Sequence, residues 1–271
     1  MVNGFFGKIL VIDVGRKQFH EEKIEDDIYL EFLGGKGLGA YLLLKKNPLQ
    51  VDPFASENNL IFSTGPASDI SVWGANRYGC FTKSPLTGIF SESYAGGKAY
   101  QQIARTGYDA IVITGASEEW VYLEITSNKV AFHNGSFLKG KDCFETEYIL
   151  KEKYKQTSSA VLTIGPAGEN LVRYAYINND YGRCLGRTGT GAVLGSKKIK
   201  ALVFTGNVKK EAYDPELLTQ FRKELFKAGK DHPVVTAYKR KGTSQIVDLT
   251  TKVDAFPARY WQEGTVPHVN S

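Results

Sequence analysis

The chain has 271 residues, 42% of them hydrophobic and 23% charged, which is typical of a packed globular protein of one large or two modest domains. The net charge of +5 makes an anionic ligand easy to accept, but basic and aromatic residues do not alternate, which argues against nucleic-acid binding. No apolar run reaches the length of about 18 residues that predicts a membrane span, and no secretory signal is visible.

The early part of the chain alternates in a β-rich pattern. Residues 5–14 and 17–24 predict an N-terminal hairpin, and 26–46 predicts two helical pieces around a glycine turn at 34–37. Further strands are predicted at 59–67, 77–85, 109–115, 121–126, 129–134, 159–165, 173–178 and 200–206. Helices are predicted at 98–107 and 145–155.

The character of the sequence changes after Gly206. The following segment is polar and helical in period, and Pro215 stands in its first turn. A domain boundary is therefore predicted near 207–213. We expect a first domain over 1–208 and the beginning of a helical domain over 209–271.

A short motif occurs twice in the first domain. The tripeptide GPA stands at 65–67 and again at 165–167, and each copy follows an apolar strand. Each is followed by an Arg–Tyr pair, a glycine cluster and a strand that ends in glycine. Four features in one order, about 90–100 residues apart, predict a duplicated unit. The fold class is predicted to be α+β, with two related sheets.

The second glycine cluster, CLGRTGTGAVLGSKK at 184–198, matches neither a P-loop nor a dinucleotide-binding fingerprint. Glycines let backbone amides approach an anion closely, and Arg187 supplies a planar donor fork suited to phosphate. Alternatively, the glycines only make tight turns and let strands pack. Two clusters in equivalent places favour either two copies of a phosphate-bearing ligand or one ligand with two such groups, such as a metal chelated by two phosphorylated pterins.

The cysteines and histidines are few and scattered. Cys80, Cys143 and Cys184 form no C-x-x-C pair, so a disulfide framework and a complete metal or cluster site are both disfavoured. We expect a reducing, cytoplasmic compartment and no metal ligands from these side chains.

Several segments together resemble the aldehyde ferredoxin oxidoreductase family. They are GGKGLGAYLLLK (34–45), GPASDISVWGANRYGCFTKSPLTG (65–88), YAGGKAYQQIARTGYDAIVITG (94–115), IGPAGENLVRYAYINNDYGRCLGRTGTGAVLGSKKIKALVFTG (164–206) and FPARYWQEG (256–264). The resemblance implies a β-rich platform that carries a tungsten, or molybdenum, bis-pterin cofactor, and a [4Fe–4S] cluster in the full-length enzyme. It also implies an Mg²⁺ ion that bridges the pterin phosphates.

The resemblance assigns cofactor-binding roles to three short segments. Arg77, next to Asn76, matches an arginine between pterin and cluster, although an ordinary surface salt bridge is the alternative. The loop by the first phosphate matches Tyr94, Ala95, Gly96 and Gly97. The second loop matches Arg187, Thr188, Gly189 and Gly191.

Two positions depart from the family pattern. Where this chain has Tyr94 the family commonly has Asn, so only a contact through the backbone carbonyl would survive. Where it has Thr188 the family commonly has Gly, and a β-branched residue there needs a negative φ or accepts strain. Both departures question local ligand geometry rather than the family.

Members of the family are roughly twice as long as this chain, and their cluster cysteines and substrate-channel residues lie in the part beyond it. The implied reaction oxidises a small aldehyde to a carboxylate and passes electrons to ferredoxin or an equivalent carrier. The 271-residue chain alone is expected to be inactive. Alternatives are an aromatic acyl-CoA reductase of the same family, a non-catalytic pterin-binding scaffold subunit, and an ordinary phosphate-binding protein. A homo-oligomer is left open.

Overall fold

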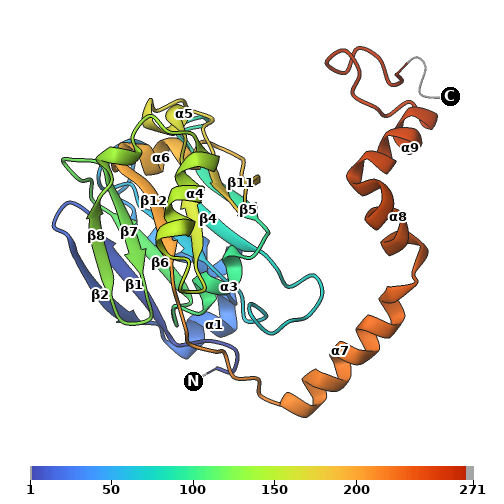
Figure 1. Cartoon of the computed structure of the whole chain (residues 1–271), viewed down its shortest axis with the longest axis horizontal. Helices are drawn as coiled ribbons and strands as arrows, with labels where there is room; N and C mark the ends of the chain where they lie inside the picture. Colours follow the sequence, from blue (N-terminus) through green and yellow to red (C-terminus); the bar gives the residue numbers. More distant parts are fainter. Residues whose placement is uncertain (1, 267–271) are drawn as a thin grey trace. The chain divides into compact units, whose positions relative to one another are not determined.

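The computed structural model describes residues 2–266 and divides into two compact units, one up to Tyr213 and one from Asp214 (Figure 1). The first unit holds twelve strands in two six-stranded sheets. The strands of the first sheet are β1 (Lys8–Asp13), β2 (Gln18–Lys23), β3 (Leu60–Ser63), β4 (Tyr78–Lys83), β5 (Phe90–Ala95) and β6 (Ala110–Thr114). Those of the second are β7 (Val121–Ile125), β8 (Val130–Asn134), β9 (Ala160–Thr163), β10 (Ile177–Asn179), β11 (Arg183–Leu185) and β12 (Ile199–Phe204).

The two sheets have the same topology. The first has the order β2-β1-β6-β3-β4-β5, and the second, read from β8, has the order β8-β7-β12-β9-β10-β11. Each sheet contains one parallel pair, β1 with β6 and β7 with β12, and its other pairs are antiparallel. The strands that precede the GPA motifs, β3 and β9, hold the same position in their sheets. The predicted α+β class and the two related sheets are therefore confirmed.

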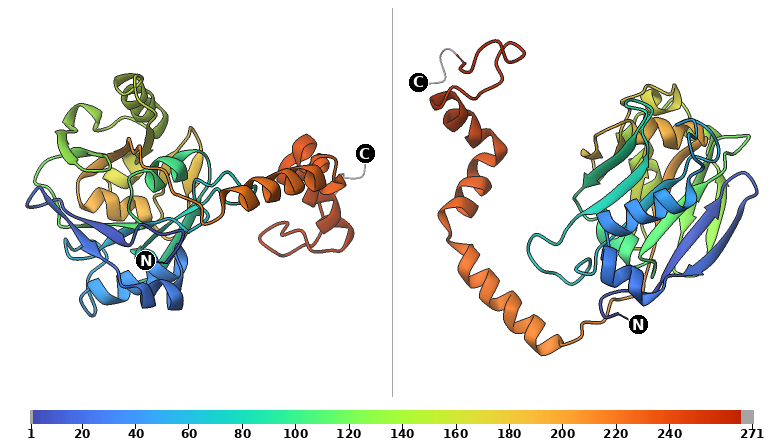
Figure 2. Two further views of the ribbon diagram at one scale, coloured as in Figure 1. Left: turned by 90° about the horizontal axis from the view of Figure 1, so that it is seen from below. Right: turned by 180° about the vertical axis from the view of Figure 1, so that it is seen from behind.

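Helices cover the outer faces of both sheets and fill the space between them. Outside the first sheet lie α1 (Asp26–Phe32) and α2 (Lys36–Lys46), and outside the second lies α4 (Cys143–Lys153). Figure 2 shows these helices on opposite sides of the unit. Between the sheets, α3 (Ala99–Ala104) and α6 (Thr190–Ser196) contribute Ile103, Val193 and Leu194 to the largest apolar cluster.

The strands form where the sequence is apolar on both faces, because each sheet is buried on both sides. In β12 all six residues of IKALVF are buried, and in β6 four of five are. The hairpin β1–β2 differs, since β2 (QFHEEK) is an edge strand whose residues are mostly exposed. Its charged side chains keep the sheet edge from pairing with another chain.

Most sequence-predicted elements are present, including the N-terminal hairpin and the two helical pieces at 26–46. The strand predicted over 173–178 is wrong for most of its length, because only Ile177 and Asn178 of that range belong to β10. Residues 172–175 instead form a turn, in which the Ala175 amide donates to the Val172 carbonyl. The Ala175 carbonyl accepts a hydrogen bond from the Gly191 amide. The strands β5 and β11 were not predicted.

The two Arg–Tyr pairs do not occupy equivalent positions in the two sheets. The pairing of β3 with β4 and of β9 with β10 makes Tyr78 equivalent to Ile177, whereas Tyr174 lies three residues earlier in a turn. The glycine clusters do correspond, because Ala95 and Leu185 pair with these equivalent residues. Gly96 and Gly186 consequently follow equivalent strand ends.

The second unit is helical. It contains α7 (Pro215–Lys230), α8 (Pro233–Lys241) and α9 (Ile246–Lys252). Asp214 caps α7 by accepting a hydrogen bond from the Leu217 amide at 2.8 Å, and Pro215 occupies the first helical position. Among its described residues only Thr251 is buried, and many apolar side chains are exposed. No helix of residues 2–266 combines the length and hydropathy needed to cross a bilayer.

Candidate functional site

The two glycine loops lie next to each other. The first, which we call loop A, comprises Gly96, Gly97 and Lys98 after β5, and the second, loop B, comprises residues 186–189 after β11. Strands β5 and β11 are edge strands of different sheets that contact each other. The Arg187 amide donates a hydrogen bond to Ser93 Oγ of β5 at 3.2 Å. Duplication has therefore placed two equivalent loops side by side.

Arg77 lies against loop A. Its Nη1 donates to the Asn76 side-chain oxygen at 2.8 Å, and its guanidinium occupies the place where a Cβ on Gly96 would stand. Asn76 and Arg77 are exposed, and Tyr78, which follows, pairs with Ala95 in the ladder between β4 and β5. The structure therefore brings four of the predicted residues, Asn76, Arg77, Ala95 and Gly96, to one end of the first sheet.

Tyr94 points away from the interior at the same strand end, with 41% of its surface exposed. Its hydroxyl donates to Glu92 Oε2 at 3.1 Å. Partial burial, followed by this hydrogen bond, raises the pKa of Tyr94 to about 12. The side chain is thus a neutral phenol near pH 7, and it can donate but does not add negative charge.

Loop B is tightly packed against the first half of the unit. Gly189 has a φ of 82°, and a Cβ there would overlap the Arg173 carbonyl and contact Pro85. A Cβ on Gly191 would overlap the Tyr176 backbone. These two glycines are therefore required by close packing, as the alternative interpretation of the cluster held, whatever else the loop binds.

Thr188 is strained. Its φ of 65° is left-handed, a region that β-branched residues rarely adopt. The Ser84 hydroxyl donates to the Thr188 carbonyl at 2.8 Å, and the Ser91 hydroxyl contacts the Thr188 hydroxyl. Of the two outcomes expected for this position, the chain adopts the strained one, held by serines of the first half.

The loops present backbone donors that the protein itself does not use. Within residues 2–266, the amides of Gly96, Gly97, Thr188 and Gly189 have no hydrogen-bond acceptor, and Gly96 and Gly189 are buried. Buried amides almost always have a partner, so four unpaired ones in two adjacent loops indicate that an external acceptor completes them.

The charge around the loops is positive. Arg77 and Arg187 are exposed, and within the part of the chain that the structure describes neither pairs with a carboxylate. Arg173 and Arg183, which flank loop B in the sequence, also lack such a partner there. The salt bridge considered for Arg77 is therefore absent among these residues. Unpaired guanidiniums beside free amides form a donor set that fits a polyanion such as a pterin phosphate.

No metal site made of side chains accompanies these donors. Residues 2–266 contain no group of three or more His, Cys, Asp or Glu side chains that could hold a metal ion. Cys80, Cys143 and Cys184 are free thiols, and burial raises the pKa of each. Any metal held by these loops would have to bind through backbone carbonyls or through the ligand.

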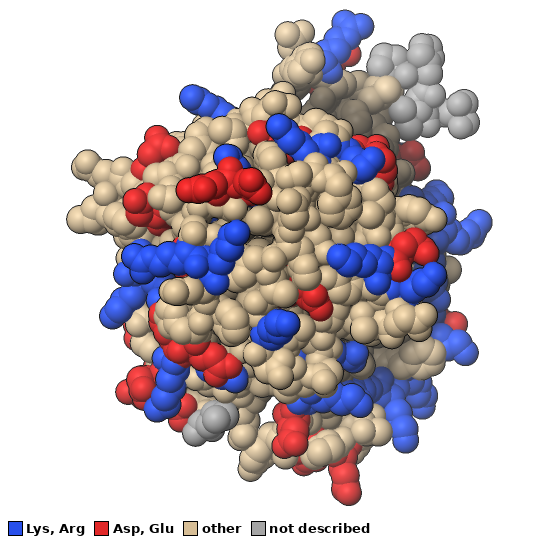
Figure 3. Space-filling view, turned by 60° about the vertical axis from the view of Figure 1, so that its left-hand side comes forward, with Lys and Arg blue, Asp and Glu red and all other residues tan. Residues whose placement is uncertain are grey.

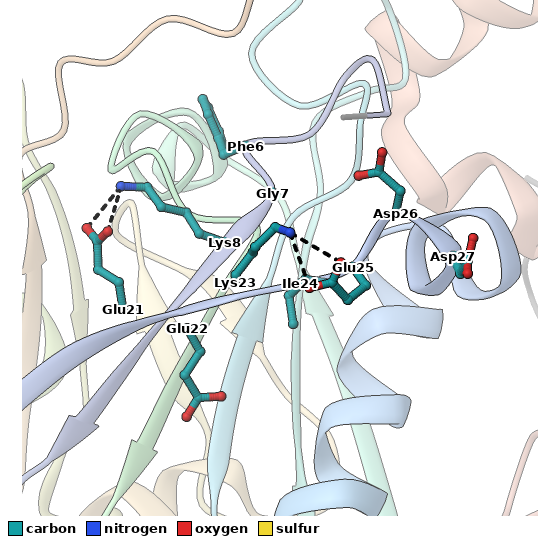
Figure 4. Close-up of a pocket in the computed structure, with 10 residues that line it drawn as sticks. All are labelled: Phe6, Gly7, Lys8, Glu21, Glu22, Lys23, Ile24, Glu25, Asp26 and Asp27. Atoms are coloured by element: carbon teal, nitrogen blue, oxygen red, sulfur yellow. Dashed lines mark hydrogen bonds and ion pairs between the residues drawn. The ribbon is translucent and has the colours of Figure 1, made fainter.

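A charged cavity lies elsewhere in the first unit. It has a volume of about 760 Å³ and is lined by charged side chains of the N-terminal hairpin and the start of α1. In Figure 4, Lys8 pairs with Glu21 and Lys23 with Glu25. Figure 3 likewise shows positive and negative side chains interspersed over one face of the protein. Carboxylates outnumber lysines in this lining, and both of its lysines are paired, so the cavity lacks the unpaired donors found at the glycine loops.

Sequence reasoning missed the residues that support the loops. Asn179 and Asp180 of the second sheet contact loop A, and Ser84, Ser91 and Ser93 of the first sheet contact loop B. The stretch NNDYG at 178–182 carried a turn signal, because Asn, Asp and Gly tolerate left-handed backbone. That signal predicts the turn but cannot show which loop it meets.

The sequence and the fold resemble those of known proteins. A family model described as the N-terminal domain of aldehyde ferredoxin oxidoreductase matches residues 9–206. The tungsten-containing aldehyde ferredoxin oxidoreductase of Pyrococcus horikoshii is 36% identical over 262 residues, which are 96% of this chain and 43% of that protein. The enzyme of the same description from Thermococcus kodakarensis is 34% identical and is covered to 44%.

A solved structure is also similar. It is the active-site complex BamBC of benzoyl coenzyme A reductase with 1,5-dienoyl-CoA, with a TM-score of 0.81 and 33% identity. The match covers 86% of this chain and 36% of that chain. The present chain therefore spans less than half the length of the relatives it matches.

Proposed function

The chain belongs to the aldehyde ferredoxin oxidoreductase family, and on that premise we propose that loops A and B bind the two phosphate-bearing halves of one tungsten bis-pterin cofactor. The observation that carries the proposal is the set of unpaired amides in two adjacent loops, flanked by Arg77 and Arg187. A charge-assisted hydrogen bond contributes about 1.5–3 kcal/mol, so several of them anchor a polyanion firmly.

The residues of this chain have a binding and orienting role in the proposed enzyme. Arg77 and loop A would hold one pterin phosphate, and Arg187 with loop B would hold the other, together with an Mg²⁺ ion. When bound, the tungsten would supply the oxygen-transfer and redox chemistry that oxidises an aldehyde to a carboxylate. We propose that a [4Fe–4S] cluster, with ligands outside this chain, belongs to the same enzyme, and that ferredoxin or an equivalent carrier is its partner in the cytoplasm.

Cofactor occupancy in the full-length enzyme tests the proposal. Replacing Arg187 by Ala should remove most bound tungsten and pterin while leaving the thermal stability of the cofactor-free protein nearly unchanged. Arg77→Lys should also lose cofactor, because lysine keeps the charge but not the planar fork. Arg16→Ala, at an exposed position in the N-terminal hairpin, serves as the control. Full occupancy in Arg187→Ala, measured by metal mass spectrometry and oxidised-pterin fluorescence, would contradict the site.

The structural likeness to a benzoyl-CoA reductase complex favours a second candidate, the reduction of an aromatic acyl-CoA on the same platform. The substrate pocket is proposed to lie outside this chain, so the platform alone serves either reaction. Assays of the full-length enzyme with an aliphatic aldehyde and with benzoyl-CoA distinguish the two, each with a viologen dye as electron partner. Turnover of the thioester alone would replace the aldehyde assignment.

A further inference from the structure

Each loop is held by residues from the other half of the first unit. Loop B is fastened by Ser84, Ser91 and Ser93 of the first sheet. Loop A is fastened by Asn179 and Asp180, at the end of β10 in the second. Resting on the proposed function, we propose that Asn179 is a positioning residue that holds loop A in its ligand-binding shape.

Asn179 is fully buried, and its amide group connects three segments. Its Oδ1 accepts a hydrogen bond from the buried Tyr78 hydroxyl at 2.8 Å. Its Nδ2 donates to the Gly96 carbonyl at 3.1 Å and to Asp180 Oδ2 at 3.0 Å. The backbone of loop A is thereby tied both to the second sheet and, through Tyr78, to the strand that follows Arg77.

Asp180 also binds loop A. Its Oδ2 accepts a hydrogen bond from the Lys98 amide at 2.5 Å, so the last amide of the loop is taken while those of Gly96 and Gly97 stay open. Gly97, at a φ of 90°, has no space for a Cβ because the Asp180 carboxylate and Asn179 Nδ2 fill it. The second sheet thus holds the loop by its Gly96 carbonyl and its Lys98 amide, and uses neither the Gly96 nor the Gly97 amide.

The turn that carries these residues is itself anchored. Asp180 and Tyr181 have left-handed φ values of 46° and 50°. Buried Glu147 accepts from the Tyr181 amide at 3.0 Å and pairs with Lys151 at 2.7 Å, and Lys151 also lies 3.5 Å from Asp180. An ion pair thus supports a backbone conformation that would otherwise be unfavourable.

The duplication provides an internal comparison. By register, the residue of the first sheet equivalent to Asn179 is Cys80, since Phe62 pairs with Cys80 and Leu162 with Asn179. Cys80 is fully buried in the apolar core. The fold therefore accepts an apolar residue at this position. A buried side-chain amide must find partners for its polar atoms. At this position the amide is present in the second half, where it reaches loop A, and absent from the first half.

The test compares Asn179→Leu with Asn59→Leu in the full-length protein. Asn59 is also a buried asparagine of the first unit, but its amide bonds the Asn47 side chain at 2.7 Å instead of loop A. We expect hydrogen exchange at 96–98, where the Lys98 amide is the one with an acceptor, to become about tenfold faster in Asn179→Leu, and pterin content to fall. Asn59→Leu should change neither, and Asn179→Gln should restore neither, because its longer side chain misplaces the amide.

The outcomes separate this inference from the proposed function. Unchanged exchange at 96–98 in Asn179→Leu overturns the positioning role, even if the wild type is full of cofactor. Faster exchange with unchanged pterin content overturns it as well, because the loop shape would then not matter for the ligand. A wild-type protein that carries no pterin contradicts the proposed function instead, and the exchange comparison still decides whether Asn179 holds the loop.

Discussion

The two halves of the first unit share every strand position, yet they use different polar residues at equivalent sites. Asp109 directly precedes β6 and Lys200 lies at the same register position in β12, because Ala110 and Ala201 pair with Ser63 and Thr163 of the equivalent strands β3 and β9. Both charged side chains are buried, but with opposite sign. The apolar pattern therefore determines the sheets, whereas the polar residues are free to differ.

The two buried charges fasten different neighbours. Asp109 accepts hydrogen bonds from the amides of Phe6 and Gly7 at 2.9–3.1 Å and from the Tyr29 hydroxyl at 2.6 Å. Lys200 instead donates to the Lys141 carbonyl at 2.7 Å and to Glu169 at 2.5 Å. Asp109 thus binds the segment that precedes β1, whereas Lys200 binds two later segments of its own half.

The largest effect is expected at Asp109. Replacement by Ala leaves the buried Gly7 amide, the partly buried Phe6 amide and the buried Tyr29 hydroxyl without an acceptor, and should lower the free energy of unfolding by about 3–5 kcal/mol. Asp109→Asn keeps one acceptor oxygen and should lose less. Urea unfolding of the chain measures both. If Asp109→Ala unfolds within about 1 kcal/mol of the wild type, the buried carboxylate does not fasten the first half.

A smaller effect is expected in loop B. Gly189→Ala combines a left-handed φ with overlap of the Arg173 carbonyl, and should lower the free energy of unfolding by about 3 kcal/mol. Gly88 is the matched control, because its φ of 74° is similar but open space surrounds it. Gly88→Ala should lose only about 1 kcal/mol. Equal losses would mean that backbone conformation alone, and not packing, requires Gly189.

The third expected effect depends on pH. Lys197 is fully buried, and desolvation lowers its pKa from 10.5 to about 7, although Glu57 and Asp13 act against this. Because the unfolded state binds the proton more tightly, wild-type stability should rise from pH 7 towards pH 10.5, by up to about 1.4 kcal/mol per pH unit.

Lys197→Met removes this titration, so the stability difference between wild type and variant should move in favour of the wild type as the pH rises. Urea unfolding at several values between pH 7 and pH 9 gives the difference, and taking the difference cancels the groups that titrate in both proteins. Parallel stability curves for the two proteins would show that the Lys197 amine does not lose its proton on folding.

The sequence predicted the fold well because each half repeats a strong apolar pattern. Runs such as DAIVITG and KALVFTG are long and buried, and the GPA motifs mark equivalent strand ends. The strand prediction failed over most of 173–178 because an alternation of apolar and polar residues occurs in extended turns as well as in strands. The short strand β11 lies in a glycine-rich stretch whose pairing depends on its neighbour and not on its own residues.

The site was predictable only in part. The glycine clusters around 94–97 and 187–191 are visible in the sequence, whereas the role of Arg77 came from the resemblance to the family. The supports could not be predicted, because Asn179 meets Gly96 across 83 residues and Ser93 meets Arg187 across 94. Single hydrogen bonds between distant segments leave no periodic signal in either segment.

The account rests on the claim that the two loops share one ligand instead of binding two independent ones. The most direct measurement is the ratio of pterin to tungsten in the full-length enzyme carrying Arg77→Ala or Arg187→Ala. A shared cofactor predicts that pterin and tungsten fall together in either variant, so that the wild-type ratio is kept in whatever cofactor remains. If either variant instead loses pterin from one loop only and keeps its tungsten, the loops act separately and the claim is wrong.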